Sequence, residues 1–194
     1  MQKKVNDLMR KIIVFENVTL DGLMAGPNGE FDWAIRDDEV TQNSKEGNNS
    51  IDMFLFGRVT YDIMASFWPT PAAQSANPVF ANALNTTPKI VFSRTLKKAD
   101  WNNTRVVKEL TKEEILKLKQ EPGKNMMIFG SGTLIEQLTN LGLIDEYQLM
   151  VNPVILGKGK PLFKDIKDRI HLKLVDTKTF NSGIVLLQYQ PDKE

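Results

Sequence analysis

Two segments of the chain pass from an apolar run, through glycine, into a helix-forming stretch that begins near a hydroxyl residue. They are residues 53–61 (MFLFGRVTY) and residues 126–134 (MMIFGSGTL). At such a turn the first backbone N–H groups of the helix have no carbonyl partners, and the helix dipole makes that end positive, so it attracts phosphate. Two such turns in one chain predict a ligand with several phosphates, and a dinucleotide fits that requirement.

The composition limits the classes of protein to which the chain can belong. Its 194 residues suffice for one domain with a full core, and a formal net charge of +1 gives no general attraction to nucleic acid or membranes. The absence of cysteine excludes disulfides, thiolate catalysis and cysteine-bearing zinc sites, and the single His171 cannot build a multi-histidine metal site. We therefore expect a small-molecule substrate, no nucleic-acid or membrane partner, and no metal.

Hydropathy and the start of the chain predict its domain organisation. No apolar run approaches the length of a membrane span, and residues 1–8 are polar, without the apolar core of a signal peptide. We expect residues 1–9 to form a flexible N-terminal extension and residues 10–190 to form a single domain. A cytoplasmic location is the default expectation for such a chain.

Short apolar runs alternate with helix-forming segments. Buried strands are expected at residues 11–18, 51–56, 89–93, 105–107 and 125–129. Helices are expected at residues 60–67, after the capping box of Thr111 and Glu114, and from Leu134 to Leu141, with a weaker one within 36–48. The prolines of residues 68–78 indicate a loop. This alternation predicts an α/β fold with a largely parallel sheet covered by helices on both faces.

The end of the chain follows a different pattern from the rest. Extended segments are expected at residues 146–156, 170–179 and 184–189, and the last two are separated by residues 180–183 (FNSG), a hairpin signal. The sheet is therefore predicted to end in an antiparallel hairpin.

The first glycine turn carries a charge and a hydroxyl group. Gly57 would let a phosphate approach the backbone, Thr60 would donate its hydroxyl group, and Arg58 would add a positive charge. The alternative interpretation is an ordinary helix N-terminus with an exposed arginine.

The second turn is richer in the groups that a pyrophosphate needs. Residues 130–133 (GSGT) supply two glycines and two hydroxyl groups at the end of a strand. Ile135 occupies the third glycine position of the Rossmann fingerprint, and no Gly-Lys-Ser/Thr follows, so the segment is neither a Rossmann motif nor a P-loop. The alternative is a tight turn that allows close helix–sheet packing.

Two further segments follow strands and so lie where ligands bind in open α/β sheets. Ser93 and Arg94 end a buried strand, and Arg94 would meet an additional phosphate, such as the 2′-phosphate of NADPH; the alternative is a solvated basic turn. The loop of residues 19–30 would cover the site and bring Asp21 near a reacting proton, with Asp38 or an ordered water as the second choice.

Together these segments resemble the dihydrofolate reductase superfamily, and more closely the reductase domain of riboflavin-biosynthesis proteins and its stand-alone bacterial relatives. The matching segments are residues 20–25 (LDGLMA), 57–61 (GRVTY), 129–134 (FGSGTL), 142–146 (GLIDE) and 153–163 (PVILGKGKPLF). Their order and spacing cover nearly the whole chain, from about residue 10 to residue 190. The resemblance implies a three-layer dihydrofolate-reductase-like fold, an NADPH cofactor and hydride transfer from the nicotinamide.

The resemblance also implies which residues form the cofactor site. It assigns the cofactor to Ala25, Gly57, Arg58, Thr60, Ser93, Arg94, Phe129, Gly130, Ser131, Gly132, Thr133 and Leu134. Related stand-alone proteins are often dimers, so it implies a homodimer as well.

The substrate half of the site departs from the family pattern. Dihydrofolate reductases carry a pterin-binding carboxylate before the second strand, near Thr41 here, and riboflavin reductases carry a glutamate at the position of Phe129. Two hypotheses follow. One is an NADPH-dependent reductase of a small, heterocyclic substrate, and the other is a nucleotide-binding protein that has lost the reductase chemistry.

Overall fold

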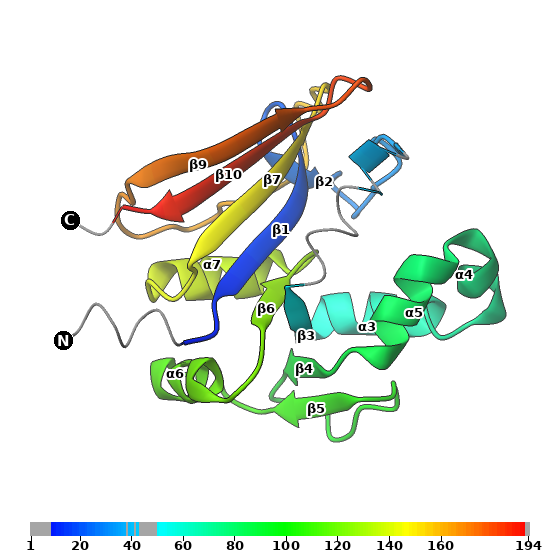
Figure 1. Ribbon diagram of the computed structural model, residues 1–194, viewed down its shortest axis with the longest axis vertical. Coiled ribbons are helices and arrows are strands. Elements are labelled where there is room, and N and C mark those ends of the chain that lie inside the picture. Colours follow the sequence, from blue (N-terminus) through cyan, green and yellow to red (C-terminus); the bar gives the residue numbers. More distant parts are fainter. Residues whose placement is uncertain (1–8, 38, 41, 43–49, 193–194) are drawn as a thin grey trace.

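The computed structural model describes residues 9–37, 39–40, 42 and 50–192. An eight-stranded sheet forms its centre, in the order β5-β4-β3-β6-β1-β7-β10-β9 (Figure 1). The strands are β1 (Ile12–Thr19), β3 (Ile51–Gly57), β4 (Lys89–Phe92), β5 (Thr104–Val107), β6 (Asn125–Ile128), β7 (Glu146–Asn152), β9 (Leu172–Thr179) and β10 (Val185–Pro191). Asp38, Thr41, residues 1–8 and most of the helix expected within 36–48 lie outside the described residues.

The direction of the strands confirms the predicted sheet. The pairs formed among β5, β4, β3, β6, β1 and β7 are all parallel, whereas β10 is antiparallel to both β7 and β9. The hairpin between β9 and β10 turns at residues 180–183, where Gly183 has a φ of 86°. That left-handed conformation favours glycine, as the hairpin signal requires.

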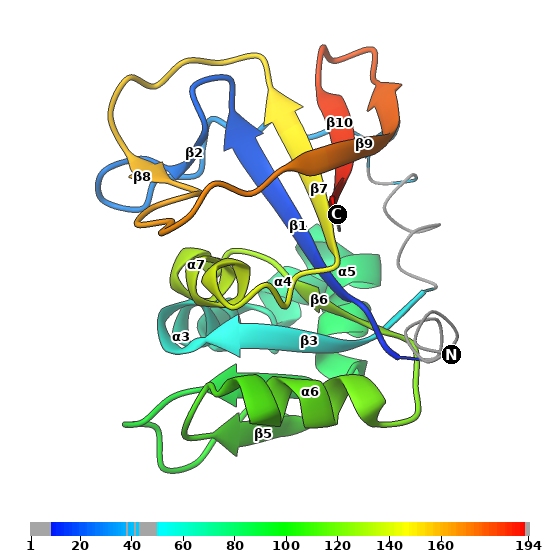
Figure 2. The same ribbon diagram turned by 90° about the vertical axis from the view of Figure 1, so that its left-hand side faces the viewer.

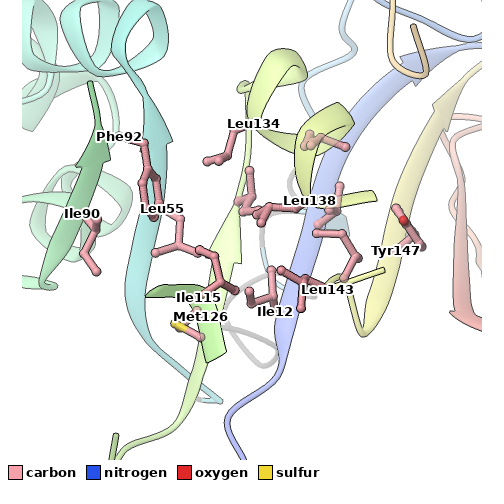
Figure 3. Packing of buried hydrophobic residues seen from close by; sticks show 14 of the residues in the cluster. Ile12, Leu55, Ile90, Phe92, Ile115, Met126, Leu134, Leu138, Leu143 and Tyr147 are labelled. Atoms are coloured by element: carbon pink, nitrogen blue, oxygen red, sulfur yellow. The ribbon is translucent and has the colours of Figure 1, made fainter. Parts of the chain in front are cut away.

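Helices cover both faces of the sheet, as expected for a three-layer fold. On one face α6 (Lys112–Gln120) and α7 (Gly132–Asn140) pack on the larger core cluster, which Figure 3 shows from close by. On the other face α3 (Arg58–Phe67) and α5 (Pro78–Thr86) enclose a second, aromatic-rich cluster. Thr111 caps α6 at the predicted position, because its hydroxyl accepts the N–H of Glu114 at 3.2 Å.

The loop expected at residues 68–78 is wrong in part. It contains the short helix α4 (Pro71–Ala76), and α5 begins at Pro78. Both prolines occupy the first helical turn, where the missing N–H costs nothing, and Thr70 and Asn77 cap the two helices with their side chains. The prolines therefore begin helices here instead of marking a loop.

The sheet opens between β1 and β6, and this opening places the candidate site. Their parallel pairing ends at Val14 and Ile128, whereas β1 continues beside β7 as far as Thr19 and Asn152. Figure 2 shows β1 rising away from β3 toward the carboxyl ends of the strands. A two-stranded antiparallel ribbon of β2 (Leu23–Ala25) and β8 (Lys160–Pro161), which the sequence did not predict as strands, lies beyond the end of β1.

Candidate functional site

The two glycine turns meet at the carboxyl ends of β3 and β6. The N–H of Gly57 donates to Oγ of Ser131 at 3.1 Å, and Oγ1 of Thr60 donates to the carbonyl oxygen of Gly130 at 2.6 Å. These hydrogen bonds join segments that lie far apart in the sequence, with separations of 74 and 70 residues. The structure therefore brings the two predicted phosphate-binding turns together into one site.

The two helices that start at this site lack side-chain caps. Gly57 and Ser131 stand at the N-cap positions of α3 and α7, and neither makes a side-chain capping hydrogen bond, whereas α4, α5 and α6 are all capped. Ser131 is a residue type that caps well, but its hydroxyl is used by Gly57. Two positive helix ends with open N–H groups at one sheet edge suit an anion with more than one phosphate.

Gly130 is required by the geometry of the second turn. Its φ of 65° is left-handed, and a Cβ at this position would come within 3.2 Å of Cγ2 of Thr60. Its N–H, however, donates to Oε2 of Glu16 at 2.6 Å. The Gly130 amide is thus already engaged, and the first turn of α7, with Gly132 and Thr133, holds the donors that are open to an anion.

The predicted cationic residues lie beside the turns. Nε of Arg58 pairs with Asp62 at 2.6 Å, and its Nη1 donates to Oγ1 of Thr95 at 3.1 Å, which links the first turn to the end of β4. Arg94 is exposed and has no ion pair or hydrogen bond within the described part of the chain. Its guanidinium group is therefore available to a ligand.

Ser93 has hydrogen-bond partners within the protein. Its side chain is buried, and its Oγ accepts the N–H groups of Thr95 at 3.3 Å and Leu96 at 3.0 Å. The hydroxyl thus shapes the turn that presents Arg94, and its contact with a ligand stays a prediction.

Asp21 connects the end of β1 to the segment that precedes β8. Its carboxylate accepts the hydroxyl of Thr19 at 2.6 Å and the N–H of Gly157 at 2.8 Å. These hydrogen bonds, that of Thr19 first, lower the pKa of Asp21 below its usual value. Such a carboxyl group is ionised near neutral pH and holds no proton to give, so its role as proton donor stays a prediction that this geometry does not support; Asp38 lies outside the described residues.

The ribbon of β2 and β8 covers the start of α7. Sδ of Met24 would lie only 2.8 Å from a Cβ added at Gly132, so any larger residue at this position would displace the methionine. Ala25 lies in the same ribbon, where it pairs with Lys160. The predicted covering loop and the β8 segment therefore form one unit over the site.

Glu16 is the residue of this site that the sequence reasoning missed. It lies on β1 between Val14 and Val18, its side chain is only 4% exposed, and it reaches across the opening to the amide of Gly130. Burial raises the pKa of Glu16 to about 8, against the lowering effect of hydrogen bonds from the backbone of Gly130 and Asn17. The sequence carried no distinct signal for it, because β1 also contains the polar residues Asn17 and Thr19.

Phe129 packs against three other aromatic rings. Its ring lies 5.4 Å from that of Phe54, 5.1 Å from that of Phe56 and 6.0 Å from that of Phe80, measured between centroids. The family's glutamate at this position is thus replaced by part of an aromatic cluster.

Two other classes of site find no support in the part of the chain that the structure covers. There, no cluster of three or more histidine, cysteine, aspartate or glutamate residues is arranged to hold a metal ion. None of the described helices combines the length and the apolar character that a membrane crossing requires.

Comparison with known proteins identifies relatives along nearly the whole chain. The family model of the RibD C-terminal domain matches residues 10–186. The uncharacterized protein YyaP of Bacillus subtilis (strain 168) is 41% identical over 180 residues, which cover 93% of this chain and 94% of that protein.

Solved structures show the same fold at low identity. The diaminohydroxyphosphoribosylaminopyrimidine deaminase/5-amino-6-(5-phosphoribosylamino)uracil reductase of Thermotoga maritima matches with a TM-score of 0.69 and 17% identity, over 98% of this chain and 59% of that one. Dihydrofolate reductase from Enterococcus faecalis, complexed with NADP(H), matches with a TM-score of 0.59 and 15% identity, over 94% and 97% of the two chains.

The buried carboxyl of Glu16 predicts a pH-dependent stability. Because its folded pKa of about 8 lies above its ordinary 4.5, the unfolded chain loses this proton first as the pH rises. The free energy of unfolding should fall by up to about 1.4 kcal/mol per pH unit between these values and level off above them. Urea unfolding from pH 5 to 9 should show this slope for the wild type relative to Glu16→Gln.

The matched control is Asp168→Asn, an exposed carboxylate near the C-terminal end of α7. It should keep the wild-type slope. A constant stability difference between wild type and Glu16→Gln at every pH would contradict the prediction.

Proposed function

Because the chain belongs to the RibD C-terminal domain family, we propose that it is an NADPH-dependent reductase that transfers a hydride to a small heterocyclic substrate. The observation that carries the proposal is the meeting of two uncapped helix N-termini, those of α3 and α7, across the Gly57–Ser131 and Thr60–Gly130 hydrogen bonds. That arrangement suits the diphosphate of a dinucleotide.

The residues present fit this cofactor. Open N–H groups of Gly132 and Thr133 would hold the diphosphate, and Arg94, free of protein partners in the described chain, would hold the 2′-phosphate that distinguishes NADPH from NADH. Arg58 adds a second positive charge beside Thr95. The E. faecalis reductase of the same fold is described in complex with NADP(H), which supports the choice of cofactor.

The nicotinamide, when bound, supplies the hydride, and the protein orients the ring and excludes water from it. The ribbon of β2 and β8, with Met24 over Gly132, would exclude water from this end of the site. Asp21 would keep that ribbon in place through its bonds to Thr19 and Gly157. Because these bonds favour its ionised form, a proton would reach the substrate from another group or from water.

The aromatic surroundings of Phe129 support a flat, apolar ring as substrate. Aromatic rings pack well against other aromatic faces and edges, and a residue without charge would not select a charged group. A reduction like that of 5-amino-6-(5-phosphoribosylamino)uracil, named for the Thermotoga relative, would require other residues to bind the charged phosphate and the polar ring substituents.

The alternative is a protein that binds NADP(H) or another nucleotide without reducing a substrate. Phe129, in place of the glutamate of the riboflavin reductases, is the observation that favours it. Both functions require the same cofactor half of the site, so turnover alone separates them.

We further propose a cytoplasmic homodimer that pairs through the edge strand β9. Every residue of β9 is exposed, including Leu172 at 38%, Leu174 at 48% and Val175 at 51%. Antiparallel pairing of β9 with a second copy would remove these apolar side chains from water. A second copy would also cover an otherwise open sheet edge.

Turnover is tested by mixing NADPH with pterin, flavin-precursor and quinone acceptors and following the loss of its near-ultraviolet absorbance. We expect oxidation with at least one heterocyclic acceptor. Binding without turnover would favour the alternative function, and no binding at all would contradict both.

A negative charge introduced into the first turn of α7 tests whether the diphosphate binds there. Thr133→Asp puts a carboxylate in the first turn of α7, where it stabilises the helix dipole but repels a diphosphate. NADPH affinity should fall by at least about tenfold, without loss of thermal stability. Gln137→Asp, one turn farther along the exposed helix surface, should leave NADPH affinity within about twofold.

The choice between NADPH and NADH should depend on Arg94. Arg94→Ala removes a charge-assisted hydrogen bond to the 2′-phosphate, worth about 1.5–3 kcal/mol, so the Kd for NADPH should rise roughly 10- to 100-fold and that for NADH should hardly change. Lys97→Ala, another exposed cation of the same loop, is the control. Equal weakening of both cofactors would remove Arg94 from this role.

Light scattering after gel filtration tests the dimer. Leu174→Asp should convert the protein to a monomer, because it places an unpaired charge in the proposed strand pair. Val79→Asp changes a residue of similar exposure, 51%, on α5 and should leave the dimer intact. A monomeric wild type would contradict the proposal.

A further inference from the structure

The opening between β1 and β6 is bridged by one side chain. Backbone pairing of the two strands stops at Val14 and Ile128. Two residues farther along each strand, Oε2 of Glu16 accepts the N–H of Gly130 at 2.6 Å. The carboxyl group thus takes the place of the next ladder hydrogen bond and fixes the turn from which α7 begins.

Glu16 lies in apolar surroundings without a compensating cation. It shares a face of β1 with Val14 and Val18, which pack in the same cluster as Leu134 of α7. No described lysine, arginine or histidine lies within ion-pair distance of it, and only backbone N–H groups, those of Gly130 and Asn17, favour its ionised form. A buried carboxylate without a cation is costly, so the neutral acid is the stable form.

The titratable residues of the neighbouring elements do not offset this cost. They are Glu136 of α7, Glu146 and Tyr147 of β7, Lys160 of β8, and Arg58, Tyr61 and Asp62 of α3. Tyr147 bonds to Thr139, Glu146 bonds to glutamine side chains, Arg58 pairs with Asp62, and Tyr61 accepts the N–H of Trp101. None of the seven lies within hydrogen-bonding or ion-pair distance of Glu16. The ionisation state of Glu16 therefore responds chiefly to what occupies the turn of residues 130–133.

We infer that Glu16 is a positioning residue of the dinucleotide site that supports binding as the neutral acid and opposes it once ionised. The inference rests on the proposed function. In the neutral form one oxygen still accepts the Gly130 N–H and holds the turn. In the ionised form a negative charge stands at the turn that leads into the donors of Gly132 and Thr133, and it repels the phosphates in a poorly screened interior.

Dinucleotide binding must then take up a proton. If only the neutral form binds, the apparent Kd rises in inverse proportion to the neutral fraction of Glu16 in the free protein. With a pKa of about 8, affinity should fall about tenfold from pH 7 to pH 9, and binding at pH 8 should take up about half a proton.

Calorimetric titration with NADPH tests this from pH 7 to 9.5, in two buffers of different ionisation enthalpy. The proteins are wild type, Glu16→Gln, which keeps an acceptor for Gly130, and Asp168→Asn as control. We expect the pH dependence and proton uptake in wild type and in Asp168→Asn, and a flat profile without uptake in Glu16→Gln. A merely structural role would lower the affinity of Glu16→Gln equally at every pH, and that result would overturn the inference.

A measurement on the wild type alone covers the case in which Glu16→Gln does not fold. The ¹³C carboxyl resonance of Glu16 can be titrated with and without NADPH, and bound NADPH should move its midpoint upward by at least about one pH unit. An unchanged midpoint in protein that binds NADPH would overturn this inference and leave the proposed function standing. Failure of NADPH to bind at any pH would overturn both.

Discussion

The candidate site depends on the hydroxyl of Ser131, which bonds to the start of the neighbouring helix α3 and does not cap its own helix, α7. A serine at an N-cap normally accepts an N–H of its own helix, whereas Ser131 accepts that of Gly57, at the start of α3. Thr60 returns the link by donating to the carbonyl of Gly130. These two hydrogen bonds hold the two turns together, and the first N–H groups of both helices have no side-chain cap. The contact between the turns is therefore suited to binding an anion.

The same turn is held from its other side by Glu16. Because β1 leaves β6 after Val14, the Gly130 amide would lack a strand partner, and the side chain of Glu16 supplies one. The separation of β1 from β6 thus leaves an amide without a strand partner, and the bond that satisfies this amide brings a carboxyl group into an apolar interior.

The sequence predicted the parts of the fold that depend on local patterns. Apolar runs located the strands, the Thr111 capping box located α6, and the hairpin signal at residues 180–183 gave the antiparallel end of the sheet. The prediction for residues 68–78 was wrong in part, because proline can either interrupt a helix or begin one. Pro71 and Pro78 begin helices here. Glu16 and the engagement of the Gly130 amide could not be predicted, since both arise from strands that separate in space and not from any spacing along the chain.

The two halves of the candidate site differ in what they demand of the sequence. The cofactor half relies on backbone N–H groups, so it requires glycine at a few positions, such as Gly130 and Gly132, and tolerates change elsewhere. The substrate half relies on side chains, and one replacement such as phenylalanine at 129 alters what it can recognise. Family membership therefore supports the cofactor that we propose more strongly than any particular substrate.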